Sequence, residues 1–233
     1  MNEEAIKIPR HVGYIIDGNR RWARAHGLPT YEGHLAGYNT FKDILRATID
    51  HGVNYVSIYA FSTENWKRGE GETGKLMKLA LRLFKTDIQE LVDENIRVQV
   101  LGTDDGLSDK VIAAARGAEQ KTAHCTRATL AICFNYGGQQ EILDAARAMI
   151  AKSATPDDIT EENFAKHLYA PDIPPLDMIV RTSGEQRLSN FMLWRAAYSE
   201  LLFLDKFWPD MTTEDVSDII QEYSRRHRRY GGQ

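Results

Sequence analysis

The sequence predicts a single α/β domain, in which a central, mostly parallel six-stranded sheet is flanked by helices. Short apolar runs of strand length alternate with stretches of helical periodicity along the chain. The 233 residues, 42% of them hydrophobic, can bury one full core. No repeat, low-complexity tract or linker divides the chain, so residues 1–233 are predicted to form one domain. Residues 1–10 are an N-terminal extension, and residues 225–233 are a basic C-terminal tail.

Each predicted element follows from its local pattern. The strand-like runs are rich in Val, Ile, Leu or aromatic residues and are bounded by Gly, Asp, Asn or Ser; they lie at residues 12–16, 55–61, 96–101, 129–134, 178–180 and 201–204. Helical periodicity predicts helices at residues 40–50, 75–95, 108–125, 139–152 and 213–228. Residues 154–175 hold four of the seven prolines and are predicted to be a surface excursion, although Thr160 begins a capping-like sequence.

Composition excludes several classes of protein. The 29 basic and 33 acidic side chains leave a net charge of -4, which argues against a nucleic-acid partner. Cys125 and Cys133 are too few for a disulfide framework and lack metal-ligand spacing, as in a cytoplasmic protein. Residues 1–10 lack the apolar core of a signal peptide, and no window approaches a membrane span, so a soluble protein is expected.

A diphosphate site is predicted after the fifth strand. Arg181 and Arg187, with Ser189, flank a glycine-containing turn that directly follows the apolar run at residues 178–180. Guanidinium and hydroxyl groups at the end of a strand are the donors with which α/β proteins bind phosphorylated ligands.

The ends of the first two strands carry further polar residues. Asp17 leaves the first strand, Gly18 lets the backbone approach a ligand, and the following N–H groups open a helix whose positive end favours an anion. A carboxylate beside a diphosphate is repulsive unless a divalent cation bridges them, so we infer Mg²⁺. The second predicted strand, at residues 55–61, is followed by Ser62, Thr63, Glu64, Asn65, Trp66, Lys67 and Arg68.

Each of these features also has an ordinary structural explanation. The Asp17 segment is typical of a turn with an N-cap, and His34 of a packed or capping histidine. Trp22 and Trp66 could be core residues, Glu200 an exposed strand end, and the arginines solvated or ion-paired. The prediction of a site therefore depends on their combination.

Five segments in order, from about residue 11 to residue 231, resemble the cis-prenyltransferases, the undecaprenyl diphosphate synthase family. They are Asp17-Gly18-Asn19-Arg20-Arg21-Trp22, Gly33-His34-x-x-Gly37, residues 59–66, Asn135-Tyr136-Gly137-Gly138 and residues 181–191.

The resemblance implies an enzyme that extends an allylic diphosphate with isopentenyl diphosphate in Z configuration, giving a carrier-lipid precursor. It implies that Asp17 and Asn65 are catalytic, that Mg²⁺ is held by Asp17 and Glu200, and that Asn65 and Ser62 lie where a proton is removed. Gly18, Asn19, Arg20, Arg21, His34 and Arg68 would surround the allylic diphosphate, and Arg181, Arg187 and Ser189 would bind isopentenyl diphosphate. Substrate contacts are also expected from Trp22, Thr63, Glu64, Trp66 and Leu188, with Trp22 and Trp66 excluding water.

The resemblance further implies a homodimer, in which the tail around Arg225–Gly231 reaches the partner's diphosphates, and an apolar tunnel between sheet and helices. Membrane contact would be peripheral, through the product. Leu76, Leu79, Ala80, Leu83 and Phe84 recur at helical spacing, a pattern that fits either a tunnel wall or a filled core. Ala60 leaves room for a long product, whereas Phe134, where the family often has alanine, favours a shorter one.

Four positions depart from the family pattern: Thr30 for a usual arginine, Arg20 for a frequent glycine, Gly69 for a common proline, and Arg195 for a usual glutamine. Gly69 is expected to loosen the loop at residues 68–74, and Arg20 could replace the charge missing at Thr30. The alternatives are a short-chain or irregular prenyl diphosphate synthase, a non-catalytic scaffold subunit, or a phosphoryl-transfer enzyme with Asp17 as nucleophile.

Overall fold

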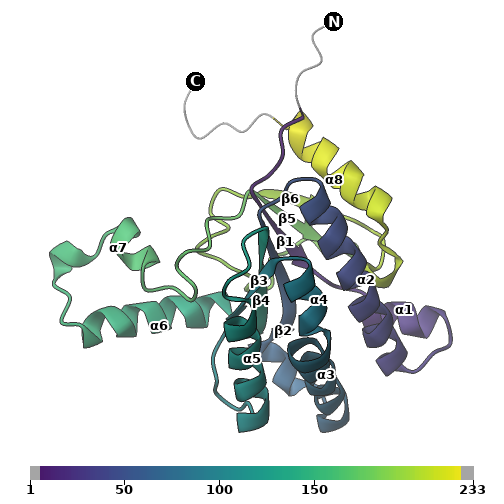
Figure 1. Ribbon diagram of the computed structural model, residues 1–233, viewed down its shortest axis with the longest axis horizontal. Helices are drawn as coiled ribbons and strands as arrows, with labels where there is room; N and C mark the ends of the chain where they lie inside the picture. Colours follow the sequence, from purple (N-terminus) through teal and green to yellow (C-terminus); the bar gives the residue numbers. More distant parts are fainter. Residues whose placement is uncertain (1–5, 227–233) are drawn as a thin grey trace, which may run out of the picture.

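The computed structural model describes residues 6–226, and its six strands form one sheet in the order β3-β4-β2-β1-β5-β6 (Figure 1). Every neighbouring pair is parallel. The predicted α/β sheet is confirmed; β3 has its predicted bounds, and the ends of the other strands differ from the prediction by at most two residues. The strands are β1 (His11–Ile15), β2 (Tyr55–Ser62), β3 (Ile96–Leu101), β4 (Ala128–Tyr136), β5 (Met178–Arg181) and β6 (Glu200–Phe203).

The helices depart more from the prediction. The helix expected at residues 40–50 begins at Thr30, directly after Pro29, and the loop expected at residues 68–74 is helical from Glu70 onward. The helices are α1 (Asn19–Ala25), α2 (Thr30–Asp50), α3 (Glu70–Arg82), α4 (Ile88–Asp93), α5 (Asp109–Thr122), α6 (Gly138–Ala151), α7 (Glu161–Ala165) and α8 (Thr213–Arg225). Short 3₁₀ turns cover Thr63–Lys67, Pro156–Asp158 and Trp208–Asp210.

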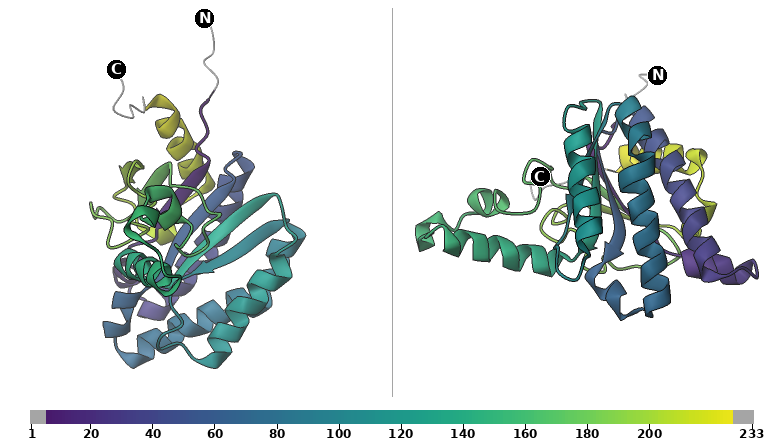
Figure 2. Two further views of the ribbon diagram at one scale, coloured as in Figure 1. Left: turned by 90° about the vertical axis from the view of Figure 1, so that its left-hand side faces the viewer. Right: turned by 60° about the horizontal axis from the view of Figure 1, so that its bottom comes forward.

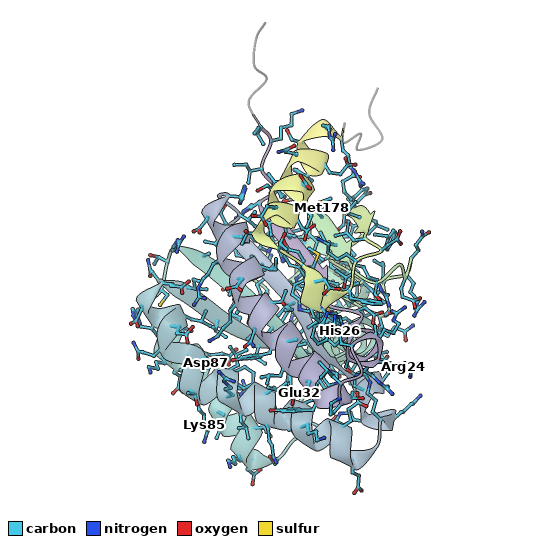
Figure 3. The ribbon with its side chains drawn as sticks, turned by 90° about the vertical axis from the view of Figure 1, so that its right-hand side faces the viewer. Arg24, His26, Glu32, Lys85, Asp87 and Met178 are labelled. Atoms are coloured by element: carbon cyan, nitrogen blue, oxygen red, sulfur yellow. The ribbon has the colours of Figure 1, made fainter. Side chains whose placement is uncertain are left out.

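The helix predicted at residues 75–95 is divided by one turn of π-helix, η2 (Leu83–Asp87), between α3 and α4. Asp87, which belongs to this turn, is labelled in Figure 3. It is buried, and its Oδ2 accepts a hydrogen bond from the Tyr38 hydroxyl at 2.8 Å and lies 2.9 Å from Lys42 Nζ. Both partners belong to α2, so the π turn anchors the end of α3 to α2.

The sheet has a different cover on each face. Side chains from alternate strand positions, such as Val12, Val56 and Leu130, pack against α2, α4, α5 and α8 in one core. Figure 2 shows α2, α3 and α5 together on that face, whereas α6 and α7 project from the rest of the molecule. On the other face, Leu176 and Phe191 of the long segment before and after β5 fill a second, smaller core. Within residues 6–226, no helix has the length and apolar character needed to cross a bilayer.

Arg195 explains how the excursion at residues 154–175 is attached. It is buried, its Nη1 lies 2.7 Å from Oε1 of the fully buried Glu141 on α6, and its Nη2 donates to the carbonyl oxygens of Tyr169 and Ala170. This departure from the family pattern therefore has a structural role in the second core, and none of these partners lines the cavity described below.

The strand order also determines where a site can form. From β1 the chain moves to β2 on one side, whereas β5, the other neighbour of β1, is reached only after β4. Ligands of open α/β sheets bind at the carboxyl ends of strands where the order reverses in this way. Asp17 follows β1, and Arg181 ends β5, so both lie at this point.

Candidate active site

A cavity of about 870 Å³ opens at the carboxyl ends of β1, β2 and β5 and runs between the sheet and helices α2 and α3. Its mouth is polar, and its interior is apolar. The five residues that could form a tunnel wall all line the cavity: Leu76, Leu79, Ala80, Leu83 and Phe84. Further apolar and aromatic side chains complete the lining, namely Tyr38, Phe41, Ile58, Ala60, Phe61, Ile132 and Phe134. The predicted apolar space is therefore present.

Asp17 lies at the mouth and is held by its neighbours. Its Oδ1 accepts a hydrogen bond from Gly18 N at 2.8 Å, and its Oδ2 accepts one from Arg181 Nη2 at 3.1 Å. Gly18 has φ 109°, a left-handed conformation suited to glycine, and an added Cβ would lie 3.0 Å from Ser183 Oγ. The turn that opens α1 thus places Asp17 beside the last residue of β5.

Arg181 organises the turn that was predicted to bind a diphosphate. The side chain is 3% exposed, and Nη1 donates to Ser189 Oγ at 2.7 Å and to the carbonyl oxygen of Arg187. Its Nε is buried without a hydrogen-bond partner. Arg187 is exposed and pairs with Glu185, whose pKa is lowered by that hydrogen bond. The turn therefore presents one buried and one exposed guanidinium at the cavity.

A second cationic group lies across the mouth, around one carboxylate of α3. Glu72 Oε1 is 3.1 Å from His34 Nε2 and 3.3 Å from Arg68 Nη1, and Oε2 is 3.8 Å from Arg20 Nη1. Burial lowers the pKa of His34 despite the hydrogen bond to Glu72. Side chains from three separate segments thus converge on one carboxylate, and their role toward the allylic diphosphate stays a prediction.

The glycines of the Gly33-His34-x-x-Gly37 segment let α1 rest against α2. An added Cβ at Gly33 would lie 2.0 Å from the carbonyl oxygen of Asn19, and one at Gly37 would lie 2.3 Å from Asn19 Oδ1. Neither distance can be tolerated, so both positions must be glycine if Asn19 is to reach the cavity.

The loop after β2 is preorganised by its own side chains. Asn65 Oδ1 accepts a hydrogen bond from Ser62 N at 3.2 Å, which closes a capping box around η1 (Thr63–Lys67). Burial acts to raise the pKa of Glu64, but hydrogen bonds from its own backbone N–H and from Ser62 and Asn190 outweigh burial and lower it. Ser62, Glu64, Asn65 and Arg68 all line the cavity.

A magnesium site would have one protein carboxylate here. No group of three or more His, Cys, Asp and Glu side chains that could hold a metal occurs among residues 6–226. Mg²⁺ is commonly held by one or two carboxylates together with substrate phosphates and water, so Asp17 at an arginine-rich mouth fits such an ion.

Comparison with known proteins identifies the family. The sequence profile of the undecaprenyl diphosphate synthase family matches residues 15–231. The chain belongs to the undecaprenyl diphosphate synthase family. An isoprenyl transferase of Thermotoga maritima is 44% identical over 229 residues, which cover 97% of this chain and 98% of that protein. The ditrans,polycis-undecaprenyl-diphosphate synthase of Micrococcus luteus, specific for (2E,6E)-farnesyl diphosphate, is 41% identical over 235 residues, with 99% and 94% covered.

The same family appears among solved structures. Lavandulyl diphosphate synthase from Lavandula x intermedia, crystallised with dimethylallyl diphosphate, matches with a TM-score of 0.93 and 33% identity over 97% of this chain and 99% of that one. As a member of the undecaprenyl diphosphate synthase family, the chain is a prenyltransferase that makes a Z-isoprenyl diphosphate.

Some residues that the resemblance assigned to the site do not line the cavity. Trp22 and Trp66 do not line the cavity, because the Trp22 indole N–H is bound to Asp210 and that of Trp66 to Asn135. The expected water-excluding wall is formed by aliphatic and phenyl side chains instead. Gly18, Arg20, Thr63 and Leu188 also lie outside the cavity lining.

Glu200 is not brought to Asp17 within one chain. It opens β6, where its register partner is Met178 at the start of β5, whereas Asp17 contacts Arg181 at the end of β5. Its carboxylate pairs with Arg226 at 3.1 Å. Within one chain Asp17 and Glu200 therefore lie at opposite ends of β5, and the metal-binding role of Glu200 stays a prediction. Of the predicted tail at residues 225–233, only Arg225 and Arg226 are among the residues that the structure describes.

Three residues at or beside the mouth were missed: Glu72, Glu185 and Asn190. Glu185 and Asn190 stand inside the segment that carries the resemblance, which could have drawn attention to them. Glu72 carried no signal, because the helix containing it was expected to be a loop.

Proposed function

We propose that this prenyltransferase condenses isopentenyl diphosphate with an allylic diphosphate, in the presence of Mg²⁺, to a Z-polyprenyl diphosphate that serves as a carrier-lipid precursor. The observation that supports it most is the cavity itself. In a cavity of about 870 Å³, a polar mouth containing Asp17, Arg181 and His34 leads into an apolar interior. Such a shape suits a ligand with a diphosphate at one end and a hydrocarbon chain at the other.

Arg181, Arg187 and Ser189 would bind the diphosphate of isopentenyl diphosphate. Arg181 already bridges Asp17 and Ser189, so its guanidinium is fixed before substrate arrives. When bound at Asp17, Mg²⁺ would neutralise charge on the allylic diphosphate and assist the departure of that group.

His34, Arg68 and Arg20 would bind the allylic diphosphate, which would take the place of the Glu72 carboxylate between them. The positive charges of Arg68 and Arg20, together with a hydrogen bond from His34, would stabilise the diphosphate as it leaves with the electron pair of the C–O bond. The carbon–carbon bond then forms, and a proton must leave the new allylic unit. Asn65 and Ser62, at the edge of the apolar space, would lie at that carbon.

The cavity volume favours one variant of this function. The volume of about 870 Å³ includes the polar mouth, so only part of it is available to a hydrocarbon chain. Phe134 narrows the interior through contacts with Phe61 at 5.5 Å and Phe84 at 5.9 Å between ring centroids. A short- or medium-chain product is therefore the second candidate.

The experiment that tests the function is incubation of the protein with Mg²⁺, isopentenyl diphosphate and allylic diphosphates of five, ten or fifteen carbons, with products read by mass spectrometry. A series of diphosphates that differ by five-carbon units, with release of inorganic diphosphate, is expected. Product from an allylic diphosphate alone would indicate irregular coupling. Absence of any carbon–carbon product with every starter would contradict the proposal and favour a scaffold subunit.

We also propose that the enzyme is a cytoplasmic homodimer and that residues 229–233 act on the partner's site. Removing them should lower turnover, and mixing the shortened chain with full-length Asp17→Asn should restore part of it, since the mixed dimer then has one complete site. No recovery in the mixture would contradict action across the dimer.

A further inference from the structure

We propose that Asn190 is a positioning residue for the isopentenyl diphosphate subsite, which it fixes against helix α6 and against the loop after β2; this inference rests on the proposed function. Asn190 is half-buried between the mouth of the cavity and the first turn of α6. It belongs to the same turn as Arg187 and Ser189.

Asn190 satisfies donors at the start of α6. Its carbonyl oxygen accepts a hydrogen bond from Gly138 N at 2.7 Å, and its Oδ1 accepts one from Gln139 N at 2.8 Å. The first N–H groups of a helix have no partner within the helix, so this residue from a distant segment acts as their cap.

The glycines that precede and open α6 make room for this contact. An added Cβ at Gly137 would lie 2.8 Å from Asn190 Nδ2, and one at Gly138 would lie 3.0 Å from the carbonyl oxygen of Asn190. The Asn135-Tyr136-Gly137-Gly138 segment is thereby the part of the chain against which Asn190 packs.

The first turn of α6 is itself held in place by buried hydrogen bonds. Glu141, in the first turn of α6, is fully buried, and its carboxylate receives hydrogen bonds from Tyr136 and Arg195 at 2.6 and 2.7 Å. The first turn of α6 is therefore tied to β4 and to the second core.

The turn that carries the substrate-binding groups needs such anchors. Ser189 has φ 48°, Asn190 has φ 67°, and Met192 has φ 41°, all in the left-handed region. Residues other than glycine adopt this region at a cost, which asparagine tolerates best. The conformation that brings Ser189 Oγ to Arg181 is thus maintained by contacts outside the turn.

Asn190 also joins the two halves of the mouth. Its Nδ2 donates to Glu64 Oε1 at 3.2 Å, whereas its Oδ1 faces α6. The amide alone can do both, because it has a donor on one side and an acceptor on the other.

Asn190→Asp separates the two contacts. It keeps the acceptor for α6, where a carboxylate is favoured by the helix dipole, but it places an oxygen against Glu64. We expect unchanged or higher thermal stability and an increase of about tenfold in the KM and Kd of isopentenyl diphosphate, with the allylic KM within about twofold. The Kd is measured by calorimetry with Mg²⁺ and isopentenyl diphosphate. Asn163→Asp, a surface asparagine of α7, is the matched control.

A double-mutant cycle completes the test. In the Asn190→Asp background, Glu64→Gln restores a donor–acceptor pair, so the double variant should bind isopentenyl diphosphate better than additivity of the single variants predicts. Wild-type affinity in Asn190→Asp, or strict additivity, would overturn the positioning role while leaving the proposed function intact. A wild-type enzyme that binds no isopentenyl diphosphate would overturn both.

Discussion

Arg20 stands at an unusual position for a substrate-binding cation, since it is half exposed and reaches the mouth only through Glu72, at 3.8 Å. Thr30, where the family usually has an arginine, begins α2. Arg20 contacts the same carboxylate as His34 and Arg68, so its charge would act on the allylic diphosphate.

Arg20→Ala should therefore raise the allylic KM by about tenfold, equivalent to about 1.4 kcal/mol, and leave the isopentenyl KM within about twofold. Steady-state kinetics with each substrate varied in turn measure both constants. Arg24→Ala, on the same helix (Figure 3), is the control. Equal effects of Arg20→Ala on both KM values would contradict this assignment.

His11 gives a prediction about acid stability. It is completely buried, its Nδ1 donates to the Pro174 carbonyl oxygen at 2.9 Å, and its Nε2 accepts from the Ser57 hydroxyl at 2.7 Å. Burial lowers its pKa from 6.5 to about 4. Because the unfolded chain binds a proton more readily, stability is complete above pH 6.5 and falls as the pH decreases toward 4.

Urea unfolding at pH 7 and pH 5 should show a loss of about 2 kcal/mol that depends on His11. His11→Gln should be less stable at pH 7 but should lose less between the two pH values. If both proteins lose the same amount, another group governs acid sensitivity.

Residue-level predictability was uneven for physical reasons. Asp17, Arg181 and Ser189 were found because each follows a recognisable strand end, and the structure brings them within hydrogen-bonding distance. Glu200 also belongs to a strand, but it lies at the amino end of β6, whereas the site forms at the carboxyl ends of the strands. Its neighbours depend on the order and register of the strands, which the local sequence does not contain.

At the scale of elements, the start of α3 shows that the structural effect of Gly69, a departure from the family pattern, was misjudged. Gly69 was expected to loosen a loop, yet it is the N-cap of a regular helix, with φ −56° and ψ 148°. Arg68 before it is extended, with φ −75° and ψ 149°. Both conformations are compatible with a proline at residue 69.

Gly69→Pro should stabilise the protein by about 0.4–1 kcal/mol, because it restricts the unfolded chain without straining the native one. An added Cβ at Gly69 meets no atom within 4 Å. Chemical denaturation measures the change, and Gly18→Pro is the contrasting variant, since φ 109° excludes proline. A destabilised Gly69→Pro would mean that α3 begins differently in solution.

Phe134 on β4 should limit the product. Its ring contacts Phe61 and Phe84 where the cavity passes between β4 and α3, and all three side chains line the cavity. Phe134→Ala would extend the apolar space, so longer products are expected by mass spectrometry at the same substrate ratio. Phe164→Ala, on α7, is the control. An unchanged product distribution would place the end of the chain elsewhere.

The helix at residues 75–95 shows what periodicity cannot reveal. Its apolar spacing fitted a cavity wall and a filled core equally well, and it gave no sign of the π turn at Leu83–Asp87. That turn depends on Tyr38 and Lys42, which lie on a different helix and far away in the sequence.

For the molecule as a whole, the parallel sheet and its helical cover were predictable, because strand and helix alternate along the chain. The cavity was predictable only through resemblance to the family, since periodicity does not distinguish a lined space from a filled core. The structure supplies that distinction, with Asp17 and the arginines at one end of the space and Phe84 and Phe134 lining its interior.

The most direct test is a crystal structure of the enzyme with Mg²⁺, isopentenyl diphosphate and an unreactive allylic diphosphate analogue. The account predicts one diphosphate on Arg181, Arg187 and Ser189, the other near His34 and Arg68, a Mg²⁺ ion at Asp17, and the allylic chain inside the cavity between the sheet and α3. A hydrocarbon chain in solvent, or diphosphates bound away from Asp17, would contradict it.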